Sequence, residues 1–175
     1  MSLSVSSSVN GAVAHMFETL RGVLAKAAER CKETNVEEGV YLNWRMAPDM
    51  FPLATQVRFA TEIPARALSR LAGAEIPSFP DDETSFAELL ARIDRAESII
   101  NGLDRAAIDA DADVNITVPM GPMEVTLPRK VFAQNWILPN LYFHVTAAYL
   151  ILRHTGLDIG KRDFLIGLRD YIPGA

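Results

Sequence analysis

Apolar residues recur at three-and-four spacing along four stretches of the chain, and this is the spacing of amphipathic helices. The predicted helices run from Val9 to Cys31, from just after Asp49 to Gly73, from Ser85 to Leu103 and from Leu138 to His154. Ser85 and Glu88 have the spacing of a capping box, which opens the third helix. Pro64 lies inside the second pattern and predicts a kink there. Four such helices with one long crossover predict an all-α protein, a four-helix bundle.

The segment from Val114 to Leu127 has a different period. Apolar residues alternate with polar ones on both sides of Pro119-Met120-Gly121-Pro122, which predicts a small β-hairpin inserted before the last helix. A lone hairpin is marginal in water, so we expect it to lie on the helices. Pro128 suits the first position of a further helix, which Pro139 then breaks or re-phases. The tail, Leu157 to Ala175, has enough apolar residues to pack onto the body.

Length and composition favour one domain, residues 1–175, with a large core. The net charge of -5 argues against nucleic-acid binding, which calls for a clustered basic face. The longest apolar run, Val145 to Leu152, is far shorter than the roughly 20 residues of a membrane helix. Cys31 is the one cysteine and cannot form an intramolecular disulfide, which fits a reducing compartment. We therefore expect a soluble cytoplasmic protein with no membrane or nucleic-acid partner.

Charged residues on the second helix follow a regular spacing. Glu62 has Arg58 and Arg66 four residues to either side. Opposite charges four positions apart on a helix stabilise each other weakly. This spacing predicts a charge ladder on the surface.

The last predicted helix is apolar on nearly every face and yet carries His144 in its middle. A buried imidazole needs a hydrogen-bond partner, a charge partner or a metal. Three interpretations stay open: a core histidine bonded to a neighbouring group, one wall of a metal-free ligand pocket, or a metal ligand. Asn140, four residues earlier, has the spacing of a second ligand, but an amide binds transition metals poorly. Gln56 on the second helix is a candidate for the same interior.

Three segments resemble an uncharacterised bacterial family grouped with the DinB/YfiT-like four-helix bundles. They are Ala47 to Leu53, Phe79 to Thr84, and the run from Leu138 to Val145 that continues through Ile159 to Phe164. The resemblance covers nearly the whole chain. It implies a DinB-like up-down-down-up bundle, often dimeric through helix faces, with no established activity for this branch.

Better-known members of that superfamily hold a divalent metal with three histidines, and some are thiol-dependent transferases or hydrolases. By position, His144, Asn140 and Gln56 match those ligands here, so two of the three are amides. Our first hypothesis is a homodimer with a small interior pocket near His144, Asn140, Gln56 and Trp136 that binds a small molecule without a metal or other cofactor. The alternative is a divalent-metal-dependent transferase or hydrolase that holds Zn or Ni through the same three residues. A purely structural dimer without a ligand is a third reading.

Overall fold

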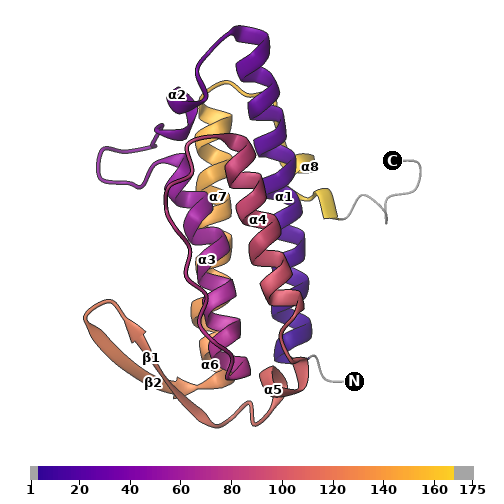
Figure 1. Ribbon diagram of the computed structural model, residues 1–175, viewed down its shortest axis with the longest axis vertical. Coiled ribbons are helices and arrows are strands. Elements are labelled where there is room, and N and C mark those ends of the chain that lie inside the picture. Colours follow the sequence, from indigo (N-terminus) through magenta and orange to yellow (C-terminus); the bar gives the residue numbers. More distant parts are fainter. Residues whose placement is uncertain (1–3, 168–175) are drawn as a thin grey trace.

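Four long helices make up the body of the protein, and the computed structural model describes them within residues 4–167 (Figure 1). They are α1 (Val5–Thr34), α3 (Leu53–Ala72), α4 (Phe86–Asn101) and α7 (Leu138–His154). The shorter elements are α2 (Glu38–Leu42), α5 (Arg105–Asp109), β1 (Asn115–Met120), β2 (Met123–Pro128), α6 (Arg129–Phe132), the π-helical turn η1 (Ala133–Ile137) and α8 (Lys161–Phe164). All four predicted helices and the predicted hairpin are present.

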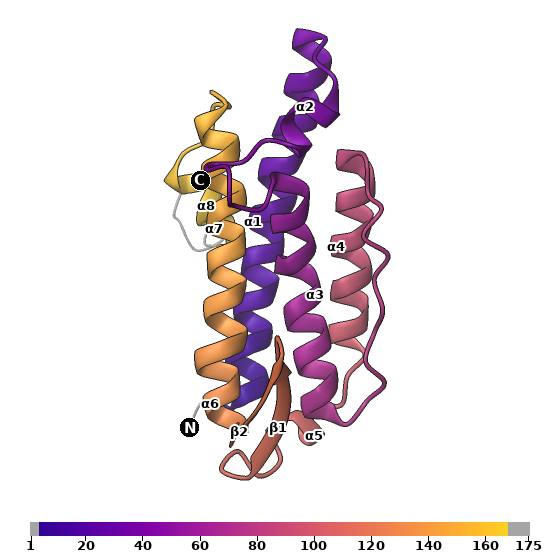
Figure 2. The same cartoon turned by 90° about the vertical axis from the view of Figure 1, so that its left-hand side faces the viewer.

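The long helices run up, down, down and up. In Figure 2, α1 rises from the foot of the bundle, α3 descends, a long connection climbs back along the outside, α4 descends again and α7 rises. This is the topology that the resemblance implies, and the connection between α3 and α4 is the predicted crossover. The hairpin projects beside α3 at the foot of the bundle, just before the final ascent (Figures 1 and 2).

Side chains from all four long helices meet in one apolar core. Fully buried examples are Phe17 of α1, Leu68 of α3, Phe86 and Ile93 of α4, and Leu141 of α7. Apolar burial at about 25 cal/mol per Å² is the main stabilising contribution of such a core. No helix within residues 4–167 is long and apolar enough to cross a membrane.

The ends of α1 differ from the prediction by about a turn. The helix begins at Val5 rather than Val9, because the Ser4 hydroxyl accepts a hydrogen bond from the Ser7 backbone N–H at 3.1 Å. Asp109 of α5 adds a second cap, accepting from the Ser6 backbone N–H at 2.7 Å and from its hydroxyl at 2.6 Å. The serine-rich start of the chain is therefore helical.

A buried arginine fixes the crossover to the bundle. The side chain of Arg92 is 2% exposed, and its guanidinium contacts Glu83 at 2.7 Å, Asp81 at 3.1 Å and Glu62 at 3.5 Å. It also donates to the Thr61 hydroxyl at 2.9 Å and lies over the Phe79 ring. Because a buried charge without partners is strongly destabilising, the crossover must close over α4 for this arginine to be buried.

The predicted change of register at Pro139 takes the form of η1. Proline has no N–H to donate to the carbonyl four residues earlier, so the regular α-helical pattern cannot continue into it. The chain instead widens into a π-helical turn at Ala133–Ile137 between α6 and α7. Such turns are frequent at functional sites.

The hairpin pairs as predicted and is attached at its base. Ile116 lies opposite Leu127 in the antiparallel ladder, and Gly121 takes a φ of 63° in the turn. Val118 is its one buried side chain within the described residues. Directly after β2, the Arg129 guanidinium donates to the carbonyls of Leu71 and Ala107 at 2.7 and 2.6 Å. Arg129 thus ties the hairpin stem to the ends of α3 and α5.

The chain after α7 packs back on α1, as expected for the tail up to residue 167. The Thr19 hydroxyl donates to the carbonyl of Phe164 at 2.7 Å, and Lys26 pairs with Asp163 at 2.6 Å. The rest of the predicted tail, 168–175, lies outside the described residues.

Candidate functional site

His144 lies in the middle of α7, 7% exposed, and forms a hydrogen bond across to α3. Its Nδ1 is 2.8 Å from Oε1 of Gln56, while Nε2 of Gln56 donates to the Phe51 carbonyl at 3.1 Å. Since the amide nitrogen is used in that second bond, Oε1 must accept, and the proton sits on Nδ1 of the imidazole. Gln56, a candidate for the same interior as His144, thus contacts it directly, while a ligand pocket shared by the two residues stays a prediction.

The surroundings of His144 keep it neutral. Burial lowers the pKa of the imidazole from 6.5 to about 4. Its neighbours include the rings of Phe59 and Phe143, each with its centroid 5.2 Å from the imidazole centroid. A side chain with a pKa near 4 is a weak base at pH 7, so this histidine is poorly suited to general-base chemistry.

Asn140 does not join this pair. Its amide nitrogen donates to the Trp136 carbonyl, one turn earlier in the same helical segment, at 2.8 Å. Trp136 lies in η1 and is half-buried. Of the four residues predicted to share a pocket, the structure joins His144 to Gln56 and Asn140 to Trp136, as two separate pairs.

The three residues that match the superfamily's metal ligands do not fit a divalent transition metal. Of the three residues only His144 offers a strong ligand atom, its Nε2, while Oε1 of Gln56 accepts from Nδ1 of His144 and the Asn140 amide nitrogen binds a backbone carbonyl. Amides are also weak ligands for such metals. Within residues 4–167, no group of three His, Cys, Asp or Glu side chains lies close enough together to hold an ion.

A groove of about 390 Å³ lies between α3, the hairpin and the α6–η1 segment; we call it the hairpin groove. Its apolar lining includes Phe59, Ile63, Val118, Phe132 and Trp136, and its charged lining on α3 is Glu62, Arg66 and Arg70. Phe59 also contacts His144, so the histidine pair lies directly behind one end of the groove. Ligand pockets typically combine an aromatic lining with a few polar groups in this way.

The predicted charge ladder on α3 is formed only in part. Glu62 pairs with Arg66 at 2.6 Å as predicted, but Arg58 turns to Glu83 of the crossover at 2.8 Å. Arg70 was not singled out, although it continues the four-residue spacing from Glu62 and Arg66. This four-residue spacing of charges beside an apolar stripe is the sequence pattern from which Arg70 could have been predicted to line a groove.

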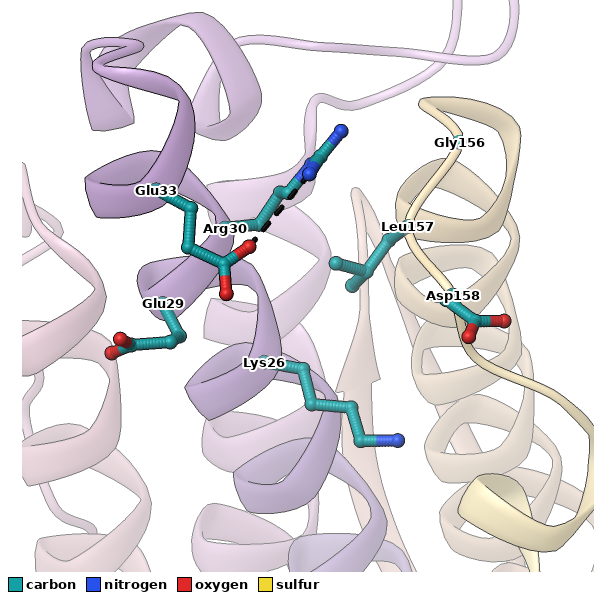
Figure 3. A pocket seen from close by; sticks show the side chains of 7 residues that line it. All are labelled: Lys26, Glu29, Arg30, Glu33, Gly156, Leu157 and Asp158. Carbon is teal, nitrogen blue, oxygen red and sulfur yellow. Dashed lines mark ion pairs between the residues drawn. The ribbon is translucent and has the colours of Figure 1, made fainter.

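A second hollow, of about 360 Å³, lies between α1 and the loop that follows α7 (Figure 3). Five of its seven lining residues are charged, and Leu157 is its main apolar side chain. Figure 3 shows Arg30 paired with Glu33 there. The two charged groups are 3.7 Å apart, and Lys26 pairs with Asp163 of α8 at 2.6 Å. Because its cations already have partners and its apolar lining is small, this hollow is the poorer candidate for an organic ligand.

Comparisons with known proteins agree with this fold. A family model described as Domain of unknown function (DUF1993) matches residues 7–165. The crystal structure of a DinB family member protein from Shewanella denitrificans is similar, with a TM-score of 0.79 and 33% sequence identity over 90% of this chain and 88% of that one. No curated protein matches the chain. With its crossover bundle and its hairpin before the last long helix, the chain belongs to the DUF1993 family of uncharacterised, DinB-like domains.

Proposed function

We propose that this protein binds a small organic molecule in the hairpin groove, without a metal, and that it works as a homodimer in the cytoplasm. The observation that carries the proposal is the groove itself: aromatic rings from α3, α6 and η1 face a space of about 390 Å³ beside uncovered cationic side chains. Volumes of roughly 300–1,000 Å³ are typical of small-molecule sites. The ligand lies against Trp136, where the sequence had indicated a pocket, but outside the core rather than within it.

The buried histidine pair supports the groove rather than performing chemistry. The bond from His144 to Gln56 ties α7 to α3 at the level of Phe59, which forms one end of the groove. This explains why a polar pair is kept inside an apolar interface: it fixes the positions of the two helices that carry the groove's aromatic residues. This role requires no metal, because Nδ1 of His144 and Oε1 of Gln56 bind each other directly.

An uncovered apolar face on α7 supports the homodimer. Tyr142, Phe143 and Leu150 are 43%, 59% and 46% exposed, and no element within residues 4–167 covers them. Monomeric proteins rarely expose a large contiguous apolar patch. A two-fold axis across this face would bring each α7 against its copy. The single buried cysteine, Cys31, is consistent with a reducing cytoplasm.

The test of binding is mass spectrometry of small molecules that remain bound during purification of protein without an affinity tag. We expect a copurifying molecule that is lost in Trp136→Ala and retained in Trp44→Ala, because Trp44 lies away from the groove. Retention of the molecule by Trp136→Ala would contradict binding in the groove. A stoichiometric divalent ion that disappears in His144→Ala would contradict the metal-free site.

The homodimer is tested by light scattering at micromolar concentration. We expect Leu150→Glu to produce a monomer, because a carboxylate would have to be buried in the interface. Met123→Glu is the matched control, since Met123 is also exposed but lies at the hairpin tip. A wild-type monomer would refute this part of the proposal and leave the ligand site untouched.

A further inference from the structure

We infer that the ligand of the hairpin groove is an organic anion, with a flat apolar body that lies on Trp136 and Phe59 and an acidic oxygen group that faces Arg66 and Arg70. This inference rests on the proposed function and names the class of molecule bound. The experiment below distinguishes a groove that binds no small molecule from a groove that binds one without preferring an anion.

The charged side of the groove carries excess positive charge, although the chain as a whole is acidic at -5. Its one carboxylate, Glu62, is shared between two arginines: Oε1 lies 2.6 Å from Arg66 and Oε2 lies 3.5 Å from the buried Arg92. Within residues 4–167, none of the ion pairs or side-chain hydrogen bonds involves Arg70. The groove therefore offers one unpaired guanidinium and the remaining N–H groups of another.

The two arginines lie on the same face of α3, four residues apart, so their guanidinium groups border one stretch of the groove. Guanidinium groups bind carboxylate, sulfonate and phosphate oxygens through paired N–H donors, and such charge-assisted bonds are stronger than neutral ones. The hairpin wall opposite contributes Val118, Pro119 and Gly121, which carry no charge. An anion in the groove must therefore turn its acidic end toward α3.

The remaining lining suits a flat apolar body. Trp136 and Phe59 come from different elements and both border the groove, while Phe132 and Val118 are buried at its base. Aromatic side chains bind planar groups by stacking and by edge contacts. A purely inorganic anion would leave this surface exposed to water, and a purely apolar molecule would leave Arg70 without a counter-charge. A molecule with a flat apolar body and an acidic oxygen group would cover the aromatic lining and supply a counter-charge to Arg70.

The experiment compares two fluorescent probes that share one aromatic body. 1-Anilinonaphthalene-8-sulfonate carries a sulfonate, and N-phenyl-1-naphthylamine has the same rings without it. The protein used is the full chain with Trp44→Phe, which leaves Trp136 as its single tryptophan. Quenching of Trp136 by energy transfer then reports that a probe has bound, and the arginine variants below test whether the bound probe lies in the groove.

We expect the sulfonate probe to bind about tenfold more tightly than the neutral probe, because one charge-assisted contact is worth about that factor. Arg70→Gln and Arg66→Gln should each reduce that affinity several-fold and leave the neutral probe unchanged. Arg30→Gln is the matched control, since it removes a cation from the second hollow. Added salt should weaken only the anionic probe.

The outcomes separate the proposal that the groove binds a small molecule from the inference that this molecule is an anion. Equal affinities of the two probes, or arginine variants that bind the sulfonate probe like the wild type, would overturn the anion while small-molecule binding stands. If neither probe quenches Trp136, the inference is overturned, and the copurification test then decides the groove's function separately. Circular dichroism of each variant confirms that the bundle has folded.

Discussion

Acidification should destabilise this protein through His144 well before its carboxylates are protonated. In the folded chain, burial lowers the pKa of this imidazole to about 4, whereas in the unfolded chain it has its ordinary value of 6.5. Between these two values the unfolded chain binds a proton that the folded chain does not. By linkage, the free energy of unfolding therefore falls as pH decreases through this window.

The size of the effect follows from the two pKa values. At 1.36 kcal/mol for each pH unit between them, the full loss is about 3 kcal/mol and is reached only below pH 4. Between pH 7 and pH 5 the expected loss is about 2 kcal/mol, because the folded imidazole stays mostly neutral over that range. This is a large share of the roughly 5–15 kcal/mol that stabilises a typical domain.

Urea unfolding at pH 7 and pH 5 measures this loss for the wild type and two variants. His144→Asn keeps an N–H donor near the position of Nδ1, facing Oε1 of Gln56, but cannot titrate. It should lose about 2 kcal/mol less than the wild type on acidification. His154→Asn is the matched control, since His154 is exposed at the end of α7 and its variant should keep the wild-type loss.

The result that would refute this reasoning is equal pH dependence in the wild type and His144→Asn. An NMR titration gives an independent check, because the ring carbons of His144 should show no protonation above pH 5. A midpoint near 6.5 would mean that the imidazole is hydrated and that its bond to Gln56 does not exclude the charged form.

Three further predictions concern the structural supports of the site. Arg92→Met leaves Glu83 with Arg58 as its one remaining cation within the described residues and should cost about 3 kcal/mol in urea unfolding, whereas the exposed Arg95→Met should cost under about 1 kcal/mol. Arg129→Met removes the donor to the carbonyls at the ends of α3 and α5, so amide hydrogen exchange in the hairpin should accelerate while α4 stays protected. Asp109→Asn weakens the cap of α1 at Ser6 and should lower the unfolding free energy by about 1 kcal/mol, with a wild-type urea midpoint contradicting that role.

The helices and the hairpin were predictable because each has a strong period of its own. The three-and-four spacing of buried positions such as Val13, Phe17 and Leu20 is that of α1, and the alternation around Val118 is that of β1. The extra turn at the start of α1 was missed, because it depends on Ser4 and on Asp109, more than a hundred residues later. Long-range caps of this kind leave no local pattern.

Contacts between two helix faces were the part of the candidate site that the sequence could indicate. His144 and Gln56 were both candidates for the interior because each lies on a helix with a predicted buried face, and they contact each other there. Asn140 is not bonded to that pair, because its amide nitrogen donates to the Trp136 carbonyl four residues earlier. A side-chain bond to the backbone of the same helical segment leaves no pattern in the spacing of apolar residues.

Arg92 was missed although its position was informative. It lies three residues after Leu89 and four before Ala96, on the buried face of α4. A charged residue within an apolar stripe is costly unless it is paired, so its presence there predicts a partner from elsewhere in the chain. Which carboxylates supply that partner depends on the path of the crossover, which the helical spacing does not define.

The same arginine connects the stability of the bundle to the charge of the groove. Glu62 has two carboxylate oxygens, and the buried Arg92 takes one while Arg66 takes the other. If Glu62 served only Arg66, that pair would be neutral and Arg70 would be the one cation left over in the groove. Because Glu83 and Asp81 of the crossover contact Arg92 more closely, at 2.7 and 3.1 Å, Glu62 is left mainly to Arg66, and Arg70 remains the uncompensated cation of the groove among the described residues. The crossover that closes over Arg92 therefore also determines which ligands the hairpin groove attracts.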